Sequence, residues 1–112
     1  MDEKLRMNFR DRLDQEAREL REAEGATEAD RAPVELDQTS VGRLSRMDAM
    51  QQQAMATAQS RRRAGRLKAI EAALLRMDED EYGWCESCGE EIALGRLDLD
   101  PCAARCVSCA AG

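Results

Sequence analysis

The stretch CESCGEEIALGRLDLDPCAARCVSC, residues 85–109, contains two Cys-x2-Cys pairs separated by 17 residues. Two thiolates two residues apart at a tight turn can bind the same metal ion, and two such pairs complete a tetrahedral set of ligands. Gly89 follows the first pair, and glycine readily takes the positive φ that such a turn needs. The spacing therefore predicts a Zn²⁺ site whose ligands are Cys85, Cys88, Cys106 and Cys109.

The chemistry of four sulfur ligands indicates a structural site, because no coordination position stays open to water. Two disulfides or a thioredoxin-like redox pair are alternatives, but the surrounding sequence lacks the βαβ pattern typical of the latter. An iron–sulfur cluster also takes four cysteines, although the paired turns suit zinc better. The fifth cysteine, Cys102, is expected to be a small buried side chain, with a spare ligand or a redox-sensing thiol as the alternatives.

A helical pattern covers residues 2–24. Its apolar side chains advance 18 residues in five steps, which is 3.6 residues per step and therefore one α-helical stripe. Gly25 is expected to end this helix, and Pro33 favours a break over residues 25–36. The stripe consists of Leu5, Phe9, Leu13, Ala17, Leu20 and Ala23.

A second, longer helix is predicted from about residue 38 to 78, with Asp37, Thr39 or Ser40 as its N-terminal cap. Two apolar stripes follow it on faces roughly half a turn apart. Either the helix packs on different neighbours along its length, or it bends near Gly65. The first stripe is Leu44, Met47, Met50, Ala54 and Ala58, and the second is Leu67, Ile70, Leu74 and Met77.

The composition agrees with long solvated helices. Of 112 residues, 36% are charged and only 3% are aromatic, so little material is available for a thick core. A metal is then a reasonable requirement for folding. We predict an all-α fold, an antiparallel, coiled-coil-like helical hairpin with a small four-cysteine zinc finger at its base. The hairpin is assigned to residues 1–80, with its tip region near 25–48, and the finger to residues 81–112.

Several function classes are disfavoured. The chain has no histidine and no Gly-rich phosphate loop, so we expect no enzymatic activity. The net charge of −6 argues against wrapping a nucleic-acid backbone, and no direct sequence-specific DNA contact is expected. No secretory signal and no membrane-spanning run is recognisable, so we expect a cytoplasmic monomer without a membrane partner.

The segment Cys85-Glu86-Ser87-Cys88-Gly89 resembles the DksA/TraR family of bacterial transcription regulators. The resemblance continues through Ile92, Arg96-Leu97, Pro101 and the second cysteine pair, and includes the aromatic-Gly-aromatic step Tyr82-Gly83-Trp84. It implies a long α-helical hairpin with a four-cysteine zinc finger at its base. It also implies binding to RNA polymerase, with the hairpin tip entering the secondary channel toward the active centre rather than contacting promoter DNA.

The tip departs from the family pattern. The best-known member carries D-x-x-D-x-A there, and an ungapped count from the first cysteine matches only the intervening arginine, Arg46. Asp48 is the nearest acidic residue. Two basic positions linked to guanosine tetraphosphate hold Ala69 and Ala110, while Arg62 keeps a third. The three tip positions of the motif hold Gly42, Ser45 and Met47.

Two further surfaces have alternative interpretations. A basic cluster on the second helix is a solvated face, a contact with an acidic polymerase surface or, disfavoured by the net charge, a direct contact with DNA phosphates. Its members are Arg61, Arg62, Arg63, Arg66 and Lys68. A methionine stripe, here Met47, Met50 and Met55, more often belongs to a core than to an interface. In this chain its mismatch with the later apolar stripe favours either a partner surface or packing against a return segment with Val34, Leu36 and Val41. The resulting hypothesis is a regulator that binds RNA polymerase through the secondary channel; the alternatives are a zinc-stabilised helical adaptor for another protein and, less favoured, a DNA-binding zinc-finger protein. The proposed partner contacts are Arg46, Asp48, Arg61, Arg62 and Arg66.

Overall fold

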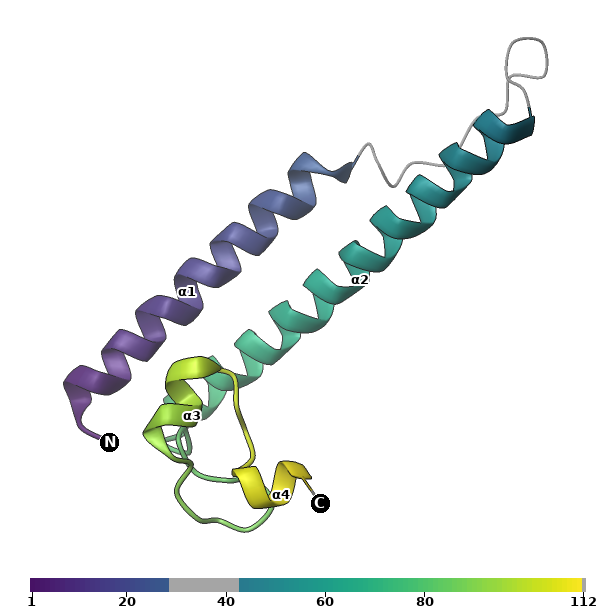
Figure 1. Cartoon of the computed structure of the whole chain (residues 1–112). Coiled ribbons are helices and arrows are strands. Elements are labelled where there is room, and N and C mark those ends of the chain that lie inside the picture. Colours follow the sequence, from purple (N-terminus) through teal and green to yellow (C-terminus); the bar gives the residue numbers. More distant parts are fainter. Residues whose placement is uncertain (29–42, 112) are drawn as a thin grey trace. The chain divides into compact units, whose positions relative to one another are not determined.

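The computed structural model describes residues 1–28 and 43–111, with side chains in the second range described from residue 45. Within these ranges the secondary structure is helical, without a β-strand; a single isolated antiparallel bridge joins Trp84 and Glu91. The all-α fold class is therefore confirmed. Figure 1 labels the helices, which are α1 (Glu3–Ala26), α2 (Arg43–Asp78), α3 (Leu94–Leu99) and α4 (Val107–Ala111).

The chain divides into two compact units. The first unit comprises Met1–Arg18 and Leu67–Gly112, and the second comprises Glu19–Arg66. We call residues 81–111 the cysteine module, and all of them lie in the first unit. The described helices include none that is both long enough and apolar enough to span a membrane.

Helix α1 confirms the first predicted helix to within two residues. Its buried side chains Phe9, Leu13 and Ala17 belong to the predicted stripe. The prediction that Gly25 ends the helix is wrong, because α1 continues through it to Ala26. The helix ends one residue later, where Thr27 donates both its backbone N–H (3.1 Å) and its hydroxyl (2.8 Å) to the carbonyl of Ala23.

Helix α2 ends at Asp78, as predicted, in a turn that closes its last carbonyls. The N–H of Glu81 donates to the carbonyl of Arg76 at 2.8 Å, and the N–H of Asp80 donates to that of Met77 at 3.3 Å. This is the Schellman arrangement, which places Asp80 at φ 58°, a left-handed position where glycine is the usual residue. At its other end, the predicted start near residue 38 and the caps at 37, 39 and 40 lie outside the described residues.

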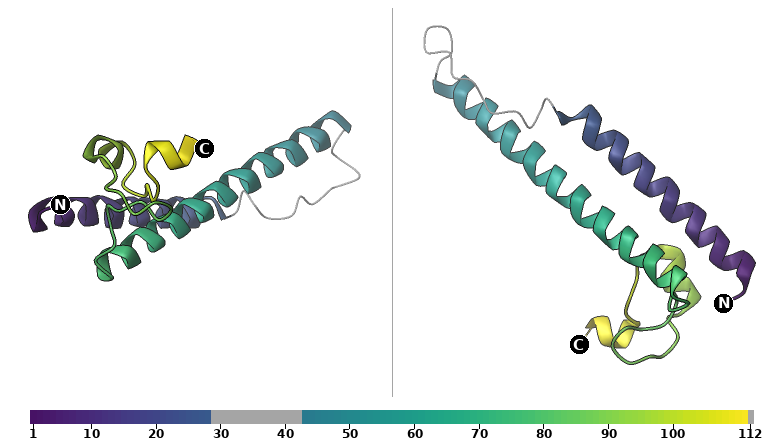
Figure 2. Two further views of the ribbon diagram at one scale, coloured as in Figure 1. Left: turned by 90° about the horizontal axis from the view of Figure 1, so that it is seen from below. Right: turned by 180° about the vertical axis from the view of Figure 1, so that it is seen from behind.

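In the first unit, α1 and α2 pack antiparallel. Ion pairs of 2.9 Å join Arg6 to Asp80 and Arg10 to Asp78, so the beginning of α1 meets the end of α2. Both views of Figure 2 show these segments next to each other. The pairs are exposed and contribute under about 1 kcal/mol each. The buried side chains between the helices carry the larger stabilisation; they are Phe9, Leu13, Ala17, Ile70, Ala73 and Met77.

In the second unit, the half-buried face of α2 is mainly polar. Met47, Met50 and Met55 lie off this face and are 55–59% exposed, so among the described residues they do not form a core. The return segment with Val34, Leu36 and Val41 lies outside the described residues, and a role of the stripe at a partner surface stays a prediction. Six half-buried positions recur at alternating steps of three and four residues, the seam of a paired helix. They are Arg46, Ala49, Gln53, Ala56, Ser60 and Arg63, and Thr57 and Arg66 beside this seam are half-buried as well.

The polar seam is in register with the apolar positions that follow it on α2. Four residues separate Arg63 from Leu67, and Ile70, Leu74 and Met77 continue the same spacing. The helix runs unbroken through Gly65. Along this spacing the sequence changes from mainly polar residues to apolar residues from Leu67 onward.

Hydrogen bonds explain how this seam accommodates polar side chains. The carboxylate of Glu24 on α1 accepts from the Ser60 hydroxyl at 2.6 Å and from Arg63 Nε at 3.1 Å. Arg63 also donates to the Thr27 hydroxyl at 2.8 Å. Arg63 therefore faces the helix pair, whereas Arg61 and Arg62 are exposed.

Candidate metal centre

The first cysteine pair lies in a tight turn held by backbone hydrogen bonds. The N–H of Gly89 donates to the carbonyl of Cys85 at 2.9 Å, and the N–H of Cys85 donates to that of Glu90 at 2.7 Å. Gly89 has φ 77°, which confirms the positive φ expected there. The turn aims both sulfurs of the pair to one side, which is the local reason that the sequence needs two intervening residues and a following glycine.

The second pair is positioned by α4. Cys106 precedes this helix and Cys109 lies within it, and the N–H of Ala110 donates to the carbonyl of Cys106 at 2.9 Å. A further backbone bond of 2.8 Å, from Glu86 to Ala104, joins the segment before this pair to the first turn. The four cysteine sulfurs consequently lie within 4.8 Å of one another.

These sulfur positions fit a tetrahedral metal ion. Zinc–sulfur bonds of about 2.3 Å in a tetrahedron place the sulfurs about 3.8 Å apart, and the sulfurs of Cys88 and Cys106 are 3.7 Å apart. A disulfide would need about 2.05 Å. The structure joins none of the five cysteines in a disulfide, and Cys102 lies outside the cluster. Cys102 is buried, as expected of a small packing side chain.

The pKa values of three of the clustered thiols are shifted in different directions. The backbone amide of Cys106, helped by that of Cys88, lowers the pKa of the Cys85 thiol to about 6. The pKa of Cys109 is raised to about 12, first by the sulfur of Cys106 and then by those of Cys85 and Cys88. At Cys88 the backbone of Glu90 lowers the pKa, but the Cys85 sulfur, desolvation and the Cys106 sulfur together raise it. Thiolates in this cluster oppose one another, and a bound dication offsets that repulsion.

Two arginines stabilise the backbone before the second cysteine pair, and the spacing of the cysteines does not predict these contacts. Arg96 Nε on α3 donates to the carbonyl of Arg105 at 2.8 Å, immediately before Cys106. The Arg105 side chain in turn forms a 3.3 Å ion pair with Glu86. These arginine contacts were not predicted from the sequence, because a hydrogen bond from a side chain to a backbone carbonyl nine residues away leaves no periodic pattern in the sequence. The one related signal was the presence of Arg96 in the family pattern.

Tyr82 anchors the cysteine module to the helices. Its side chain is 6% exposed, its hydroxyl donates to the carbonyl of Pro101 at 2.8 Å, and its ring centroid lies 6.0 Å from that of Phe9 on α1. On the α2 side, the Arg76 guanidinium donates to the carbonyl of Cys102 at 3.3 Å. These contacts fix the module within the first unit through groups that do not touch the sulfurs.

The buried phenol makes stability depend on alkaline pH. Burial raises the pKa of Tyr82 to about 12, with Cys102 adding to the increase and Arg76 opposing it. Tyrosine in an unfolded chain ionises near pH 10, so between about pH 10 and 12 only the unfolded state loses this proton. The free energy of unfolding therefore falls as pH rises through this window, by about 2 to 3 kcal/mol in all, and is unaffected by this group below about pH 9.

Tyrosinate absorbance can test this directly, because the chain contains a single tyrosine. We expect a midpoint near pH 12 in the native protein and near pH 10 in denaturant. Tyr82→Phe is the control, since it removes the absorbance change and flattens the dependence of unfolding free energy on alkaline pH. A native midpoint near pH 10 would contradict the buried, hydrogen-bonded phenol.

The five predicted partner contacts all lie on α2 in the second unit. Asp48, Arg61 and Arg62 are exposed, while Arg46 and Arg66 are half-buried. The structure does not bring them into one cluster, because the 13 residues from Asp48 to Arg61 correspond to about 20 Å along a helix. Their role in binding stays a prediction.

Comparison with known proteins connects these features to a family. The family described as "Prokaryotic dksA/traR C4-type zinc finger" matches residues 80–112. The RNA polymerase-binding transcription factor DksA of Haemophilus influenzae is 46% identical over 43 residues, which are 38% of this chain and 30% of the relative. The protein of the same name from Escherichia coli K12 is 42% identical over 43 residues and is matched over 28% of its length.

A solved structure extends the likeness beyond the cysteine module. The structure of transcription factor DksA2 from Pseudomonas aeruginosa has a TM-score of 0.79 and 30% sequence identity. The match covers 99% of this chain and 84% of the other. The curated relatives, in contrast, are matched over less than a third of their length.

Proposed function

This chain belongs to the DksA/TraR family, and from that membership we propose that it is a bacterial transcription regulator that binds RNA polymerase through the secondary channel. The observation that carries the proposal is the likeness to a transcription factor over 99% of the chain at 30% identity. The names of the matched relatives, RNA polymerase-binding transcription factors, point to the same partner. The proposal places the protein in the cytoplasm and gives it no enzymatic activity.

A structural zinc ion completes the proposal. Cys85, Cys88, Cys106 and Cys109 hold it, supported by the convergence of their sulfurs within 4.8 Å and by the all-sulfur donor set. When bound, the ion supplies a cross-link between the first turn and α4. Tyr82 and Arg76 attach the cysteine module to the helices through hydrogen bonds to the carbonyls of Pro101 and Cys102.

The proposed polymerase contacts are the α2 side chains Arg46, Asp48, Arg61, Arg62 and Arg66. Their exposed members can form ion pairs at a protein interface, where charged groups mainly set the association rate and specificity. At the tip, Ser45 and Met47 are exposed and uncharged where the family motif has an aspartate and an alanine. We therefore expect binding to the channel without the effect that paired aspartates exert at the active centre.

A competition experiment tests the polymerase proposal. The zinc-loaded chain should bind purified core polymerase at micromolar concentration in low salt, and a known secondary-channel factor should displace it. The double variant Arg61→Glu/Arg62→Glu should bind about tenfold more weakly, because two attractive charges become repulsive. Arg18→Glu/Arg21→Glu, which makes the same double charge reversal at exposed α1 residues that belong to no proposed contact surface, is the matched control and should bind like the original chain.

Each alternative outcome identifies a different protein class. If the folded, zinc-loaded chain does not bind polymerase, the remaining interpretation is a zinc-stabilised helical adaptor with another protein as its partner. Retention on duplex DNA that weakens steeply with salt would instead support a DNA-binding zinc-finger protein. Binding that the known factor fails to displace would retain the polymerase but exclude the secondary channel.

A further inference from the structure

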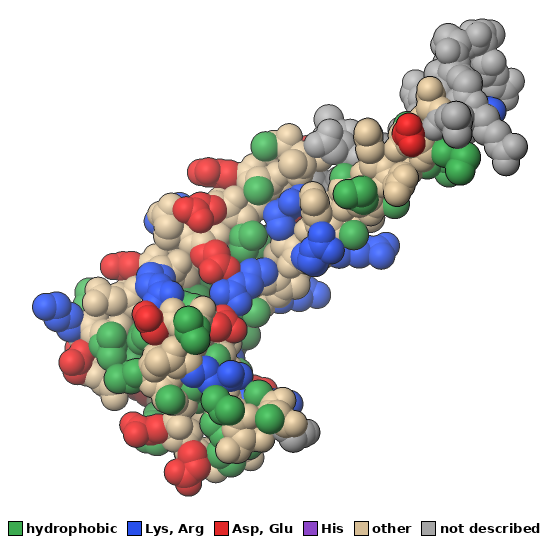
Figure 3. Space-filling model, in the orientation of Figure 1, with side chains coloured by type: hydrophobic (Ala, Val, Ile, Leu, Met, Phe, Trp, Pro, Cys, Tyr) green, Lys and Arg blue, Asp and Glu red, His purple; other side chains and the backbone are tan. Residues whose placement is uncertain are grey.

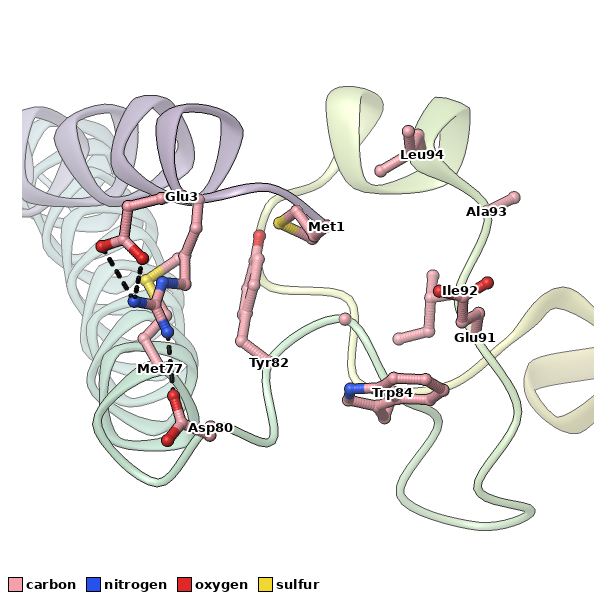
Figure 4. Close-up of a pocket in the computed structure, with 12 residues that line it drawn as sticks. Met1, Glu3, Met77, Asp80, Tyr82, Trp84, Glu91, Ile92, Ala93 and Leu94 are labelled. Atoms are coloured by element: carbon pink, nitrogen blue, oxygen red, sulfur yellow. Dashed lines mark hydrogen bonds and ion pairs between the residues drawn. The ribbon is translucent and has the colours of Figure 1, made fainter.

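A cavity of about 580 Å³ lies in the first unit, beside the entry to the cysteine module. This volume is within the range of protein ligand pockets. Figure 4 shows its lining, with Tyr82 and Met1 in the middle, the ion pairs of Glu3 and Asp80 at one end, and Trp84 and Ile92 at the other. No residue of this cavity is a cysteine, so it is distinct from the metal centre.

Exposed apolar side chains lie in the middle of the cavity and at one end. Met1 in the middle is 46% exposed, and Trp84 and Leu94 at the end are 47% and 52% exposed. Tryptophan and methionine are enriched in protein interfaces, and a tryptophan in a pocket is a frequent energetic centre of binding. In Figure 3, hydrophobic side chains lie beside acidic and basic ones over the cysteine module.

The charged side chains of the lining make the cavity acidic. Its single guanidinium, that of Arg6, donates to Glu3 at 2.9 Å and to Asp80 at 2.9 Å. Its positive charge is thus already matched within the protein. A third carboxylate, that of the exposed Glu91, belongs to the same lining. A cationic side chain therefore complements this cavity, and an acidic one is repelled.

The walls are fixed by the backbone, which lowers the cost of ordering them on binding. The N–H of Ile92 donates to the carbonyl of Gly83 at 2.8 Å, and the bridge between Trp84 and Glu91 holds the two sides together. Gly83 has φ 92°, and a Cβ there would come within 3.0 Å of the Met1 side chain. The glycine thus permits the close approach of Met1 to the wall.

We propose that this cavity is a docking site for a segment of RNA polymerase that carries a lysine or arginine beside an apolar side chain. The apolar side chain packs on Trp84 and Leu94, and the cation lies near Glu91. The inference rests on the proposed function and adds a second contact surface to it, in the first unit rather than on the α2 residues of the second. Charge complementarity and the exposed aromatic ring select this occupant over an acidic or purely polar segment.

Four variants in the full zinc-loaded chain test the docking site. Trp84→Ala should weaken binding to core polymerase by about tenfold or more, whereas Trp84→Phe, which keeps an aromatic ring, should recover most of it. Glu91→Lys should weaken binding by about tenfold through repulsion of the incoming cation. Glu90→Lys makes the same charge change at an exposed neighbour outside the lining and should change binding less than threefold.

Metal content and helical circular dichroism of each variant establish that the fold is retained. Absence of binding by the unmodified chain would overturn both the polymerase proposal and this docking site. Unmodified binding with equal affinity for Trp84→Ala and Glu91→Lys would overturn the docking site alone. Equal weakening by Glu91→Lys and Glu90→Lys would also overturn it, since a general charge effect would then replace a local contact.

Discussion

Cys85→Ser should abolish tight metal binding and remove amide protection across the cysteine module. The module has few apolar side chains of its own to offset the entropy of ordering its backbone. The buried ones are Tyr82, Ile92, Leu97, Pro101 and Ala103 with the two cysteines Cys85 and Cys102. Structural zinc sites supply about 10 kcal/mol or more of folding free energy at neutral pH. Removing one of four sulfurs at this site therefore outweighs any other single contact in the module.

Hydrogen exchange followed by mass spectrometry, together with metal analysis, measures this effect. Exchange over residues 85–109 should rise in Cys85→Ser and in the original chain treated with a strong chelator, while α1 and α2 keep helical circular dichroism. Cys102→Ala is the matched control, because this buried cysteine lies outside the sulfur cluster and should keep one equivalent of zinc. Wild-type zinc affinity in Cys85→Ser would refute the four-sulfur site.

Ile70→Ala should lower the free energy of unfolding by about 3 kcal/mol. Ile70 is fully buried, at 0% exposure, and packs in the thin layer that joins α1 to α2 in the first unit. Deleting its side chain removes buried apolar surface and leaves a cavity that a small core cannot easily refill. Small domains have about 5 to 15 kcal/mol of stability, so this single change removes a large fraction of it.

Urea unfolding in the presence of excess zinc measures the loss at Ile70. Leu75→Ala on the same helix is the control; Leu75 is 55% exposed, and we expect a loss below about 1 kcal/mol there. Similar losses for the two variants would contradict the register of the buried face of α2. A loss at Leu75 that exceeds the loss at Ile70 would place the opposite face of the helix in the core.

Local chemistry made part of this protein predictable from its sequence. The placement of both sulfurs of a cysteine pair on one side follows from the two-residue spacing and, in the first pair, from Gly89, because a tight turn produces it whatever the rest of the chain does. Helix α1 and the end of α2 follow from apolar residues at helical periods. Each of these signals depends on residues close together in the sequence.

The tertiary structure alone decided which face of α2 is paired in the second unit. The sequence pattern favoured Met47 and Met50, since apolar periodicity is the only signal of a buried face, yet Arg63 and Ser60 face α1 because Glu24 provides their hydrogen bonds. The acidic cavity at Trp84 likewise combines side chains from the beginning of α1, the end of α2 and the cysteine module. Periodicity records the polarity of a helix face, but the partner across the interface determines whether a polar face can be buried.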